Sequence, residues 1–405
     1  MTTRVSSSHH VPALDGVRGI AVLLVMLLHF SMMRPNNAFE YAFVQTLSLG
    51  WAGVDLFFVL SGFLITGILY DAKGGANYFR NFYLRRALRI FPLYYAFLIL
   101  ILVVLPRVAP GSMERLDGAP WLWTYTSNFY FATVGWEGMP EHSVHLWSLA
   151  VEEQFYLLWP VVVFFLDRTR LLRVAAGAMV IAVLFRLLMQ SAPGVSIASY
   201  ALLPARMDAL ALGGALALVV RGPSGLEGAA QLASRLLKAS GILLAVAISW
   251  NLLSFPGNSW LPPLNYPTQI VGYVGTELAS GALILWALCA TRPGLLRTLS
   301  SRPLVALGKY SYGLYLIHVP IRDLIRSWLA QRPTGLPALA GSQLPAQVAL
   351  YIVGIGVSVA IALVSWHFFE KHFLKLKALF PYGGTAGRKP MRKKLAAVQV
   401  PETES

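Results

Sequence analysis

The chain has 405 residues, of which 56% are hydrophobic and only 13% are charged, and its mean hydropathy is +0.60. A soluble globular chain is about 25% charged, so this composition argues against a soluble enzyme or a nucleic-acid-binding protein and indicates a membrane protein, in which the net charge of +15 reflects topology. The single cysteine, Cys289, excludes an intrachain disulfide and a multi-cysteine metal site, and no metal is expected.

Apolar runs of membrane-spanning length recur along the chain and predict an all-α, polytopic integral membrane protein with about ten transmembrane helices. The aromatic stretch 121–133 is too short to span and is interpreted as an interfacial or re-entrant part of an external loop at 107–145. A flexible segment at 1–10 precedes the membrane domain at 11–376, and the polar, basic tail at 377–405 is predicted to be disordered. The predicted spans are 17–33, 51–70, 88–106, 146–166, 172–190, 204–221, 237–253, 270–290, 305–329 and 347–370.

Basic residues predict the orientation, because lysine and arginine concentrate in cytoplasmic connections. Of the 33 such residues, 24 fall in connections on the side of the two termini and 4 on the opposite side. Both termini are therefore expected in the cytoplasm, in a multi-pass protein of the inner (plasma) membrane. No cleavable signal peptide is expected before the first span.

The first predicted span carries three polar residues. Asp15 and Arg18 lie at its cytoplasmic mouth, and His29 lies deeper. Eleven residues make about three helical turns, so Arg18 and His29 share one face and are about 16 Å apart. Ionisable groups inside a membrane are functional candidates, although an anchoring arginine and a packed core histidine remain the alternative.

An arginine cluster precedes the third span, where Arg85, Arg86 and Arg89 are spaced to share a helical face just before Pro92. Arginine forks match phosphate oxygens, but cytoplasmic anchoring explains the spacing equally simply and is favoured by it alone. In the preceding span, Asp55 lies in the outer part, and Gly62 is expected to allow close helix packing.

Five ionisable side chains from four predicted spans lie at one depth in the membrane. A rise of about 1.5 Å per residue places them about 20 Å above the cytoplasmic face of the bilayer core. This layer indicates a polar reaction chamber or an ion pathway, and a purely structural ion pair of Glu152, Glu153 and Arg186 is the alternative. His145 shares a face with Glu152 and is expected at the outer entrance, while Arg206 and Asp208 are expected to form an ion pair at the mouth of the sixth span. The layer consists of His29, Glu152, Glu153, Arg186 and His318.

With these residues laid out, about 11–372 of the chain resembles the acyltransferase-3 family of membrane O-acyltransferases, which includes O-acetyltransferases of bacterial cell-envelope polysaccharide and lipopolysaccharide. LDGVRGIAVLLVMLLHF contains the family's Arg-x10-His arrangement as Arg18 and His29. FYLRRALRIFPLYY contains its Arg-x-x-Arg motif as Arg86 and Arg89. The other similar blocks, in order, are GVDLFFVLSGFLIT (53–66), HLWSLAVEEQFYLLWP (145–160), ARMDALALGGAL (205–216) and GKYSYGLYLIHVP (308–320).

The resemblance implies transfer of an acyl group, most often acetyl, from cytoplasmic acyl-CoA to a hydroxyl of a cell-envelope saccharide or glycolipid, or of a small molecule such as a macrolide. Acyl-CoA would be a co-substrate, and no cofactor would be bound permanently. Some relatives carry an extra periplasmic acyl-accepting domain. This chain is expected to acylate the acceptor itself or to use a separate periplasmic partner.

The resemblance also implies roles for single residues. Arg85, Arg86 and Arg89 would bind CoA phosphates, and Arg18 would help to hold the pantetheine or phosphate end. His29 would be the general base or a transient acyl carrier, for which the ordinary pKa of histidine, about 6.5, is suited. Glu152 or Glu153 would orient His29.

Weaker acceptor or pocket candidates are Asp15, Asp55, His145, Arg186, Arg206, Asp208 and His318. A proton-coupled transporter would suit the polar layer equally well, but it has no need of a cytoplasmic phosphate site.

Overall fold

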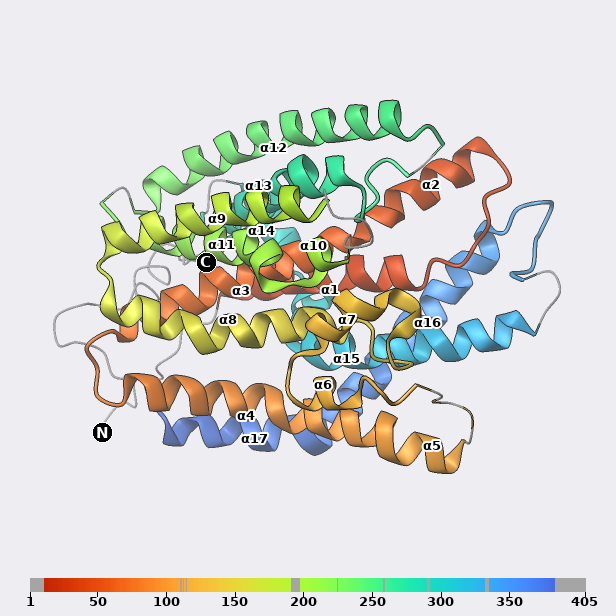
Figure 1. Ribbon diagram of the computed structural model, residues 1–405, viewed down its shortest axis with the longest axis horizontal. Coiled ribbons are helices and arrows are strands. Elements are labelled where there is room, and N and C mark those ends of the chain that lie inside the picture. The colour runs from red at the N-terminus through yellow and green to blue at the C-terminus, as the bar shows by residue number, and fades with distance from the viewer. Residues whose placement is uncertain are drawn as a thin grey trace, which may run out of the picture.

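Helices form almost all of the chain in the computed structural model, which describes residues 11–382 apart from 110, 112, 114, 191–196, 224, 258, 290–291 and 332–334. The expected all-α, polytopic fold is confirmed, since nine helical segments of the described chain are long and apolar enough to span a membrane. The long helices run nearly side by side along the longest dimension of the molecule (Figure 1). The flexible segment expected at 1–10 lies outside the described residues.

The nine segments follow the predicted spans in order, and several are built from more than one helix. Short 3-10 or π turns join the pieces in three of these segments, and Leu202 alone joins α10 to α11. The nine segments are α1 (Pro12–His29); α2 (Ala38–Ser48) with α3 (Ala52–Ala72); α4 (Tyr78–Ile99) with α5 (Leu105–Val108); α8 (Leu146–Phe165); α9 (Arg168–Gln190); α10 (Ala198–Ala201) with α11 (Leu203–Val220); α12 (Glu227–Ser254); α13 (Tyr273–Leu288); and α16 (Leu344–Ser365) with α17 (Lys371–Lys375).

The predicted ninth span corresponds to α15 (Arg302–Ala330), which follows the short α14 (Pro293–Leu299). This helix has 29 residues, enough to cross a bilayer, but its charged residues keep it below the apolarity of the other nine. It packs along α1 on one side and α16 on the other. Together with the nine segments, it makes ten helical passes in the part of the chain that the structure describes.

Several helix ends differ from the sequence-based prediction, and two of these differences bear on the polar residues. The first helix ends at His29 rather than at residue 33, so His29 is its last residue. The third begins at Tyr78, ten residues before the predicted start, because the arginine-rich segment is helical even though it is not apolar. In the expected loop 107–145, the aromatic stretch folds as two short helices, α6 (Ala119–Trp123) and α7 (Ser127–Gly138).

Close helix contacts at glycines fix the helices that carry the polar groups. Gly62 on α3 meets the backbone carbonyl of Leu210 on α11, as expected, and Gly308 on α15 meets the carbonyl of Asp15 on α1. A Cβ atom at either glycine would overlap the facing carbonyl oxygen. These contacts let the helix backbones touch and set the rotation of α1 against α15.

The last described residues, which begin the predicted tail, lie against α4. A 3-10 turn at Leu376–Leu379 continues from α17, and the segment packs on α4. Asn81 donates to the carbonyl of Pro381 at 2.7 Å, and Arg80 lies over the Phe380 ring. The rest of the predicted tail, 383–405, lies outside the described residues.

Candidate active site

A pocket of about 840 Å³ lies among α1, α3, α4, α8 and α15. Five of the residues predicted from the sequence line it together, although they come from three helices. Serine and tyrosine hydroxyls line the remaining polar wall, at Ser61, Ser148, Tyr156, Ser311, Tyr312 and Tyr315. The five predicted residues are Arg18, Arg86, Arg89, Glu152 and Glu153.

Glu152 is held by hydroxyl groups and by nearby arginines. Its carboxylate accepts hydrogen bonds from Ser61 and Tyr156, whose hydroxyls also bond to each other. Arg86 and Arg18 act on it electrostatically, and the guanidinium of Arg86 lies 5.5 Å from the centroid of the Tyr156 ring. A buried carboxylate needs such compensation, so Glu152 is fixed inside the pocket as part of an acid–arginine group.

Arg86 and Arg89 line the pocket, and carboxylates act on them only at a distance, Glu152 on Arg86 and Glu370 on Arg89. Neither forms an ion pair or donates a hydrogen bond among the described residues, whereas Arg18 pairs with Asp15 at 3.1 Å. Unsatisfied guanidinium donors in a partly enclosed pocket make a binding site for an anion, and their planar forks suit phosphate oxygens.

Arg85 does not share the face of the other two arginines, which corrects the expected three-residue cluster. Its guanidinium donates to the carbonyls of Lys377 at 2.6 Å and Phe380 at 3.0 Å, and it lies 4.6 Å from the centroid of the Tyr382 ring. Adjacent residues of a helix point about 100° apart, so Arg85 and Arg86 cannot face the same pocket. Arg85 instead fixes the segment that follows α17.

That segment brings Lys377 to the arginines, a residue that the sequence analysis missed. The ammonium group of Lys377 lies within the electrostatic range of Arg89, Arg86, Arg85 and Arg18. No sequence signal marked Lys377 among the many basic residues after the last span. Its place becomes visible only when the chain end folds back on α4. The result is a group of like charges that favours an anionic ligand.

The far end of the pocket meets a cluster of three histidines. Ser148 and Tyr315 line the pocket there, and their hydroxyls share a hydrogen bond. Beyond them, the Tyr315 ring centroid lies 5.4 Å from that of His145 and 5.5 Å from that of His318. Ser148 and Tyr315 thus form the wall between the pocket and the histidine cluster.

His29 belongs to this cluster rather than to the pocket lining. Its Nδ1 lies 2.9 Å from Nε2 of His318, and His145 stacks edge-on against His318 with ring centroids 5.3 Å apart. The groups that act on His29 electrostatically are His318 and Arg322. The expected carboxylate partner, Glu152 or Glu153, is replaced by His318 as the hydrogen-bonding neighbour, and the catalytic role of the two glutamates stays a prediction.

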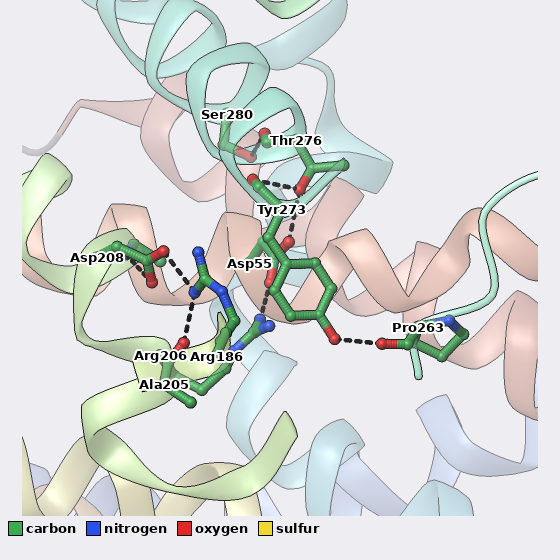
Figure 2. A network of polar contacts seen from close by, with 10 residues as sticks. Asp55, Arg186, Ala205, Arg206, Asp208, Pro263, Tyr273, Thr276 and Ser280 are labelled. Carbon is green, nitrogen blue, oxygen red and sulfur yellow. Dashed lines mark hydrogen bonds and ion pairs between the residues drawn. The ribbon is translucent and has the colours of Figure 1, made fainter. Parts of the chain in front are cut away.

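A second buried polar cluster lies apart from the pocket lining and uses the remaining sequence candidates (Figure 2). Arg206 pairs with Asp55, and Arg186 pairs with Asp208 at 2.6 Å. The expected pair of Arg206 with Asp208 is therefore wrong, because residues two apart on a helix point to nearly opposite sides. The expected grouping of Arg186 with the glutamates is wrong as well.

The same cluster includes side chains from α13. Thr276 donates to Asp55 at 2.6 Å, and Arg206 lies 4.2 Å from the centroid of the Tyr273 ring. All the charged groups are almost fully buried. The network thus ties α3, α9, α11 and α13 together, and its position indicates a structural role.

Comparison with known proteins identifies one family. The sequence model of the family Acyl_transf_3, described as an acyltransferase domain, matches residues 11–367. This match covers every helix that contributes a residue to the pocket and to the histidine cluster. No solved structure is significantly similar to the chain.

Curated relatives carry related names. The chain is 28% identical over 390 residues to O-acetyltransferase OatA of Staphylococcus aureus, which covers 90% of this chain and 57% of that protein. It is 31% identical over 382 residues to the putative peptidoglycan O-acetyltransferase YrhL of Bacillus subtilis, with 90% and 55% covered. Peptidoglycan O-acetyltransferase OatA of Listeria monocytogenes is 36% identical over 167 residues, 39% of this chain. The chain spans about half the length of the first two relatives.

Proposed function

Because this chain belongs to the acyltransferase-3 family, we propose that it is a membrane O-acetyltransferase that moves an acetyl group from cytoplasmic acetyl-CoA to a hydroxyl of a cell-envelope saccharide. Acetyl-CoA would be a co-substrate that binds and leaves in each cycle. The names of the relatives favour a saccharide acceptor over a small molecule. The inner membrane is the proposed location.

One observation carries this proposal: the pocket joins phosphate-binding chemistry at one end to acid–base chemistry at the other. Arg86 and Arg89 present guanidinium donors that form no hydrogen bond or ion pair among the described residues, and the basic side chain of Lys377 lies near them. The opposite end stops at Ser148 and Tyr315, against the histidine cluster. A ligand with several phosphates on one end and a reactive group on a long arm fits this polarity, and acyl-CoA is such a molecule.

His29 is the residue proposed to accept the proton during transfer. The acceptor hydroxyl oxygen attacks the carbonyl carbon of the thioester while its proton passes to the imidazole. The carbon–sulfur bond then breaks, and the departing thiolate of CoA takes up that proton. The proposal places the reacting groups at the wall formed by Ser148 and Tyr315, where the pocket and the histidines meet.

Purified protein in lipid nanodiscs tests the proposal directly. With labelled acetyl-CoA and a soluble peptidoglycan or polysaccharide fragment, we expect labelled ester on the fragment with wild-type protein. Loss of one charge-assisted contact costs about 1.5–3 kcal/mol, so Arg86→Ala and Arg89→Ala should each weaken acetyl-CoA binding about 10- to 150-fold.

Arg85→Ala is the matched control, because Arg85 is the neighbouring arginine and points away from the pocket. Its acetyl-CoA affinity should fall by no more than about 3- to 10-fold, the loss expected if the Lys377 segment that Arg85 holds is released. If acetyl-CoA affinity were unchanged in all three variants, the arginines would only anchor the helix at the cytoplasmic side of the membrane. Proton-driven solute uptake without any ester formation would favour the transporter alternative.

A further inference from the structure

The two histidines in direct contact define the protonation of His29. His318 is fully buried, and its Nδ1 lies 3.1 Å from the backbone carbonyl of Leu314. A carbonyl oxygen only accepts hydrogen bonds, so Nδ1 of His318 must carry the hydrogen. In a neutral imidazole the other nitrogen, Nε2, is then an acceptor.

The same reasoning passes to His29. Its Nδ1 lies 2.9 Å from Nε2 of His318, and a hydrogen bond there requires a donor on the His29 side. Nδ1 of His29 must therefore carry the hydrogen, and its Nε2 is left with the free lone pair. His29 is only partly buried as a residue, whereas His318 is fully buried, so His29 is the member of the pair that retains exposed surface.

We propose that His318 is a positioning residue for acyl transfer: it holds the Nδ1 proton of His29 and thereby makes Nε2 of His29 the basic atom. This inference rests on the proposed function for its catalytic meaning, although the tautomer itself does not depend on it. When Nε2 of His29 takes the proton of the acceptor hydroxyl, the imidazolium donates its Nδ1 hydrogen to His318 in a charge-assisted bond.

The other polar groups near His29 do not take the place of His318 as its hydrogen-bond acceptor. Arg322 acts electrostatically on His29, His145 and His318, so its positive charge opposes a second cation in the cluster. Asp323 acts on His318 but is bonded to His142 at 2.9 Å and to Arg322. His145 donates Nε2–H to the carbonyl of Leu316 at 3.2 Å, and its Nδ1 has no hydrogen-bond partner among the described residues, so it does not replace His318 as the acceptor for His29.

Nitrogen NMR on histidine-labelled, full-length protein in detergent tests the tautomer without any substrate. The His29 signals are assigned by their loss in His29→Gln. We expect wild-type His29 to carry its hydrogen on Nδ1 and His318→Leu to lose that preference. His29 with its hydrogen on Nε2 in the folded wild-type protein would overturn the proposal.

Two amide variants separate positioning from simple packing. In His318→Gln the side-chain amide lies where Nε2 of the imidazole was, whereas in His318→Asn it lies nearer the position of Nδ1. We expect kcat for acetyl transfer within about 10-fold of wild type for Gln, and a fall of about 100-fold or more for Asn and Leu. KM for acetyl-CoA should stay within about threefold in all three, because the arginines bind it.

The outcomes separate this inference from the proposed function. If wild-type protein transfers no acetyl group but shows the Nδ1 tautomer, which His318→Leu abolishes, the positioning contact stands and the proposed function fails. If transfer occurs and Gln, Asn and Leu lose kcat equally, or none loses it, His318 does not position His29 and the inference is overturned.

Discussion

At the scale of single residues, Lys377 shows how a distant side chain completes a charged site. Lys377 lies near the arginines because the guanidinium group of Arg85 donates a hydrogen bond to the backbone carbonyl of Lys377. We expect Lys377→Ala to weaken acetyl-CoA binding about 3- to 10-fold, since a partly exposed ammonium group loses less than a guanidinium pair. Isothermal titration in nanodiscs measures the affinity.

Lys375→Ala is the control for this prediction, because Lys375 is exposed and two residues away. Dephospho-CoA, which lacks one phosphate group, gives a second comparison. If Lys377 contacts that phosphate, the variant and wild type should bind dephospho-CoA alike. Equal losses from Lys375→Ala and Lys377→Ala would mean that only general surface charge matters.

The two adjacent glutamates are predicted to have different roles. Glu152 accepts from Ser61 and Tyr156 and balances Arg86, whereas Glu153 acts electrostatically on the tyrosines around Tyr94 and Tyr312. We expect Glu152→Gln to lower kcat about 10-fold or more, because it removes the negative charge that fixes Arg86 in the pocket. Initial rates of acetyl transfer measure this.

Glu153→Gln should mainly change the yield of folded protein and leave the specific activity of the folded fraction nearly unchanged. Size-exclusion chromatography separates that fraction before the assay. If activity were lost only in Glu153→Gln, the catalytic carboxylate would be that of Glu153, and the prediction for Glu152 would be wrong.

Sequence reasoning found most of these residues but not their partners. Arg18, Glu152 and Glu153 were identified because charged groups in apolar runs are costly, and Arg86 and Arg89 by their helical spacing and the family resemblance. The structure gathers all five in one pocket. Partners depend on helix rotation and tilt, which spacing along one helix does not determine. His29 and His318 are 289 residues apart, so nothing local in the sequence indicated their hydrogen bond.

At the scale of helices, apolar runs located the spans well and their ends poorly. Hydropathy follows the lipid-facing stretch, whereas a helix continues for as long as its backbone hydrogen bonds do. The arginine-rich start of α4, from Tyr78, is helical outside any apolar run. The folding of 377–382 onto α4 had no sequence signal either, because it depends on contacts made by Arg80, Asn81 and Arg85.

The buried pair between Asp55 and Arg206 is predicted to hold α3 against α11. Removing one member of a buried pair leaves an uncompensated charge and costs about 3–5 kcal/mol. We therefore expect Asp55→Ala to lower the free energy of unfolding strongly, as measured by denaturant unfolding in mixed micelles.

Asp71→Ala is a matched control at the other end of the same two helices. Asp71 pairs with Arg221 at 2.8 Å, but its side chain is 28% exposed, so its loss should cost about 1 kcal/mol or less. If both variants lost the same free energy of unfolding, burial would not make the Asp55–Arg206 pair more stabilising than the Asp71–Arg221 pair.

At the scale of the whole molecule, α1 connects the two chemical regions. Arg18 near its start lines the pocket, and His29 at its end joins the histidine cluster. A separation of eleven positions places the two regions about 16 Å apart along the membrane normal if the helix is upright. The proposed anion binding and the proposed proton transfer would then take place at different depths.

This arrangement makes the orientation of the chain decisive, and labelling of single cysteines tests it. Ten passes put the α3–α4 and α8–α9 connections at one end of the molecule and the α15–α16 connection at the other (Figure 1). In a Cys289→Ala background, a membrane-impermeant maleimide should label Asp117→Cys and Ala338→Cys in intact spheroplasts. Ala76→Cys and Thr169→Cys should react only after the cells are lysed, because basic connections stay in the cytoplasm.

All four positions are exposed in the structure, so lack of labelling reports the side of the membrane rather than burial. The reverse pattern would put Arg86, Arg89 and Lys377 on the outer side, where no acyl-CoA is available to them. The phosphate-binding role of these residues would then fail even if each variant lost activity, and the proton-transfer cluster at His29 would face the cytoplasm. The orientation thus decides which substrate meets which end of the pocket.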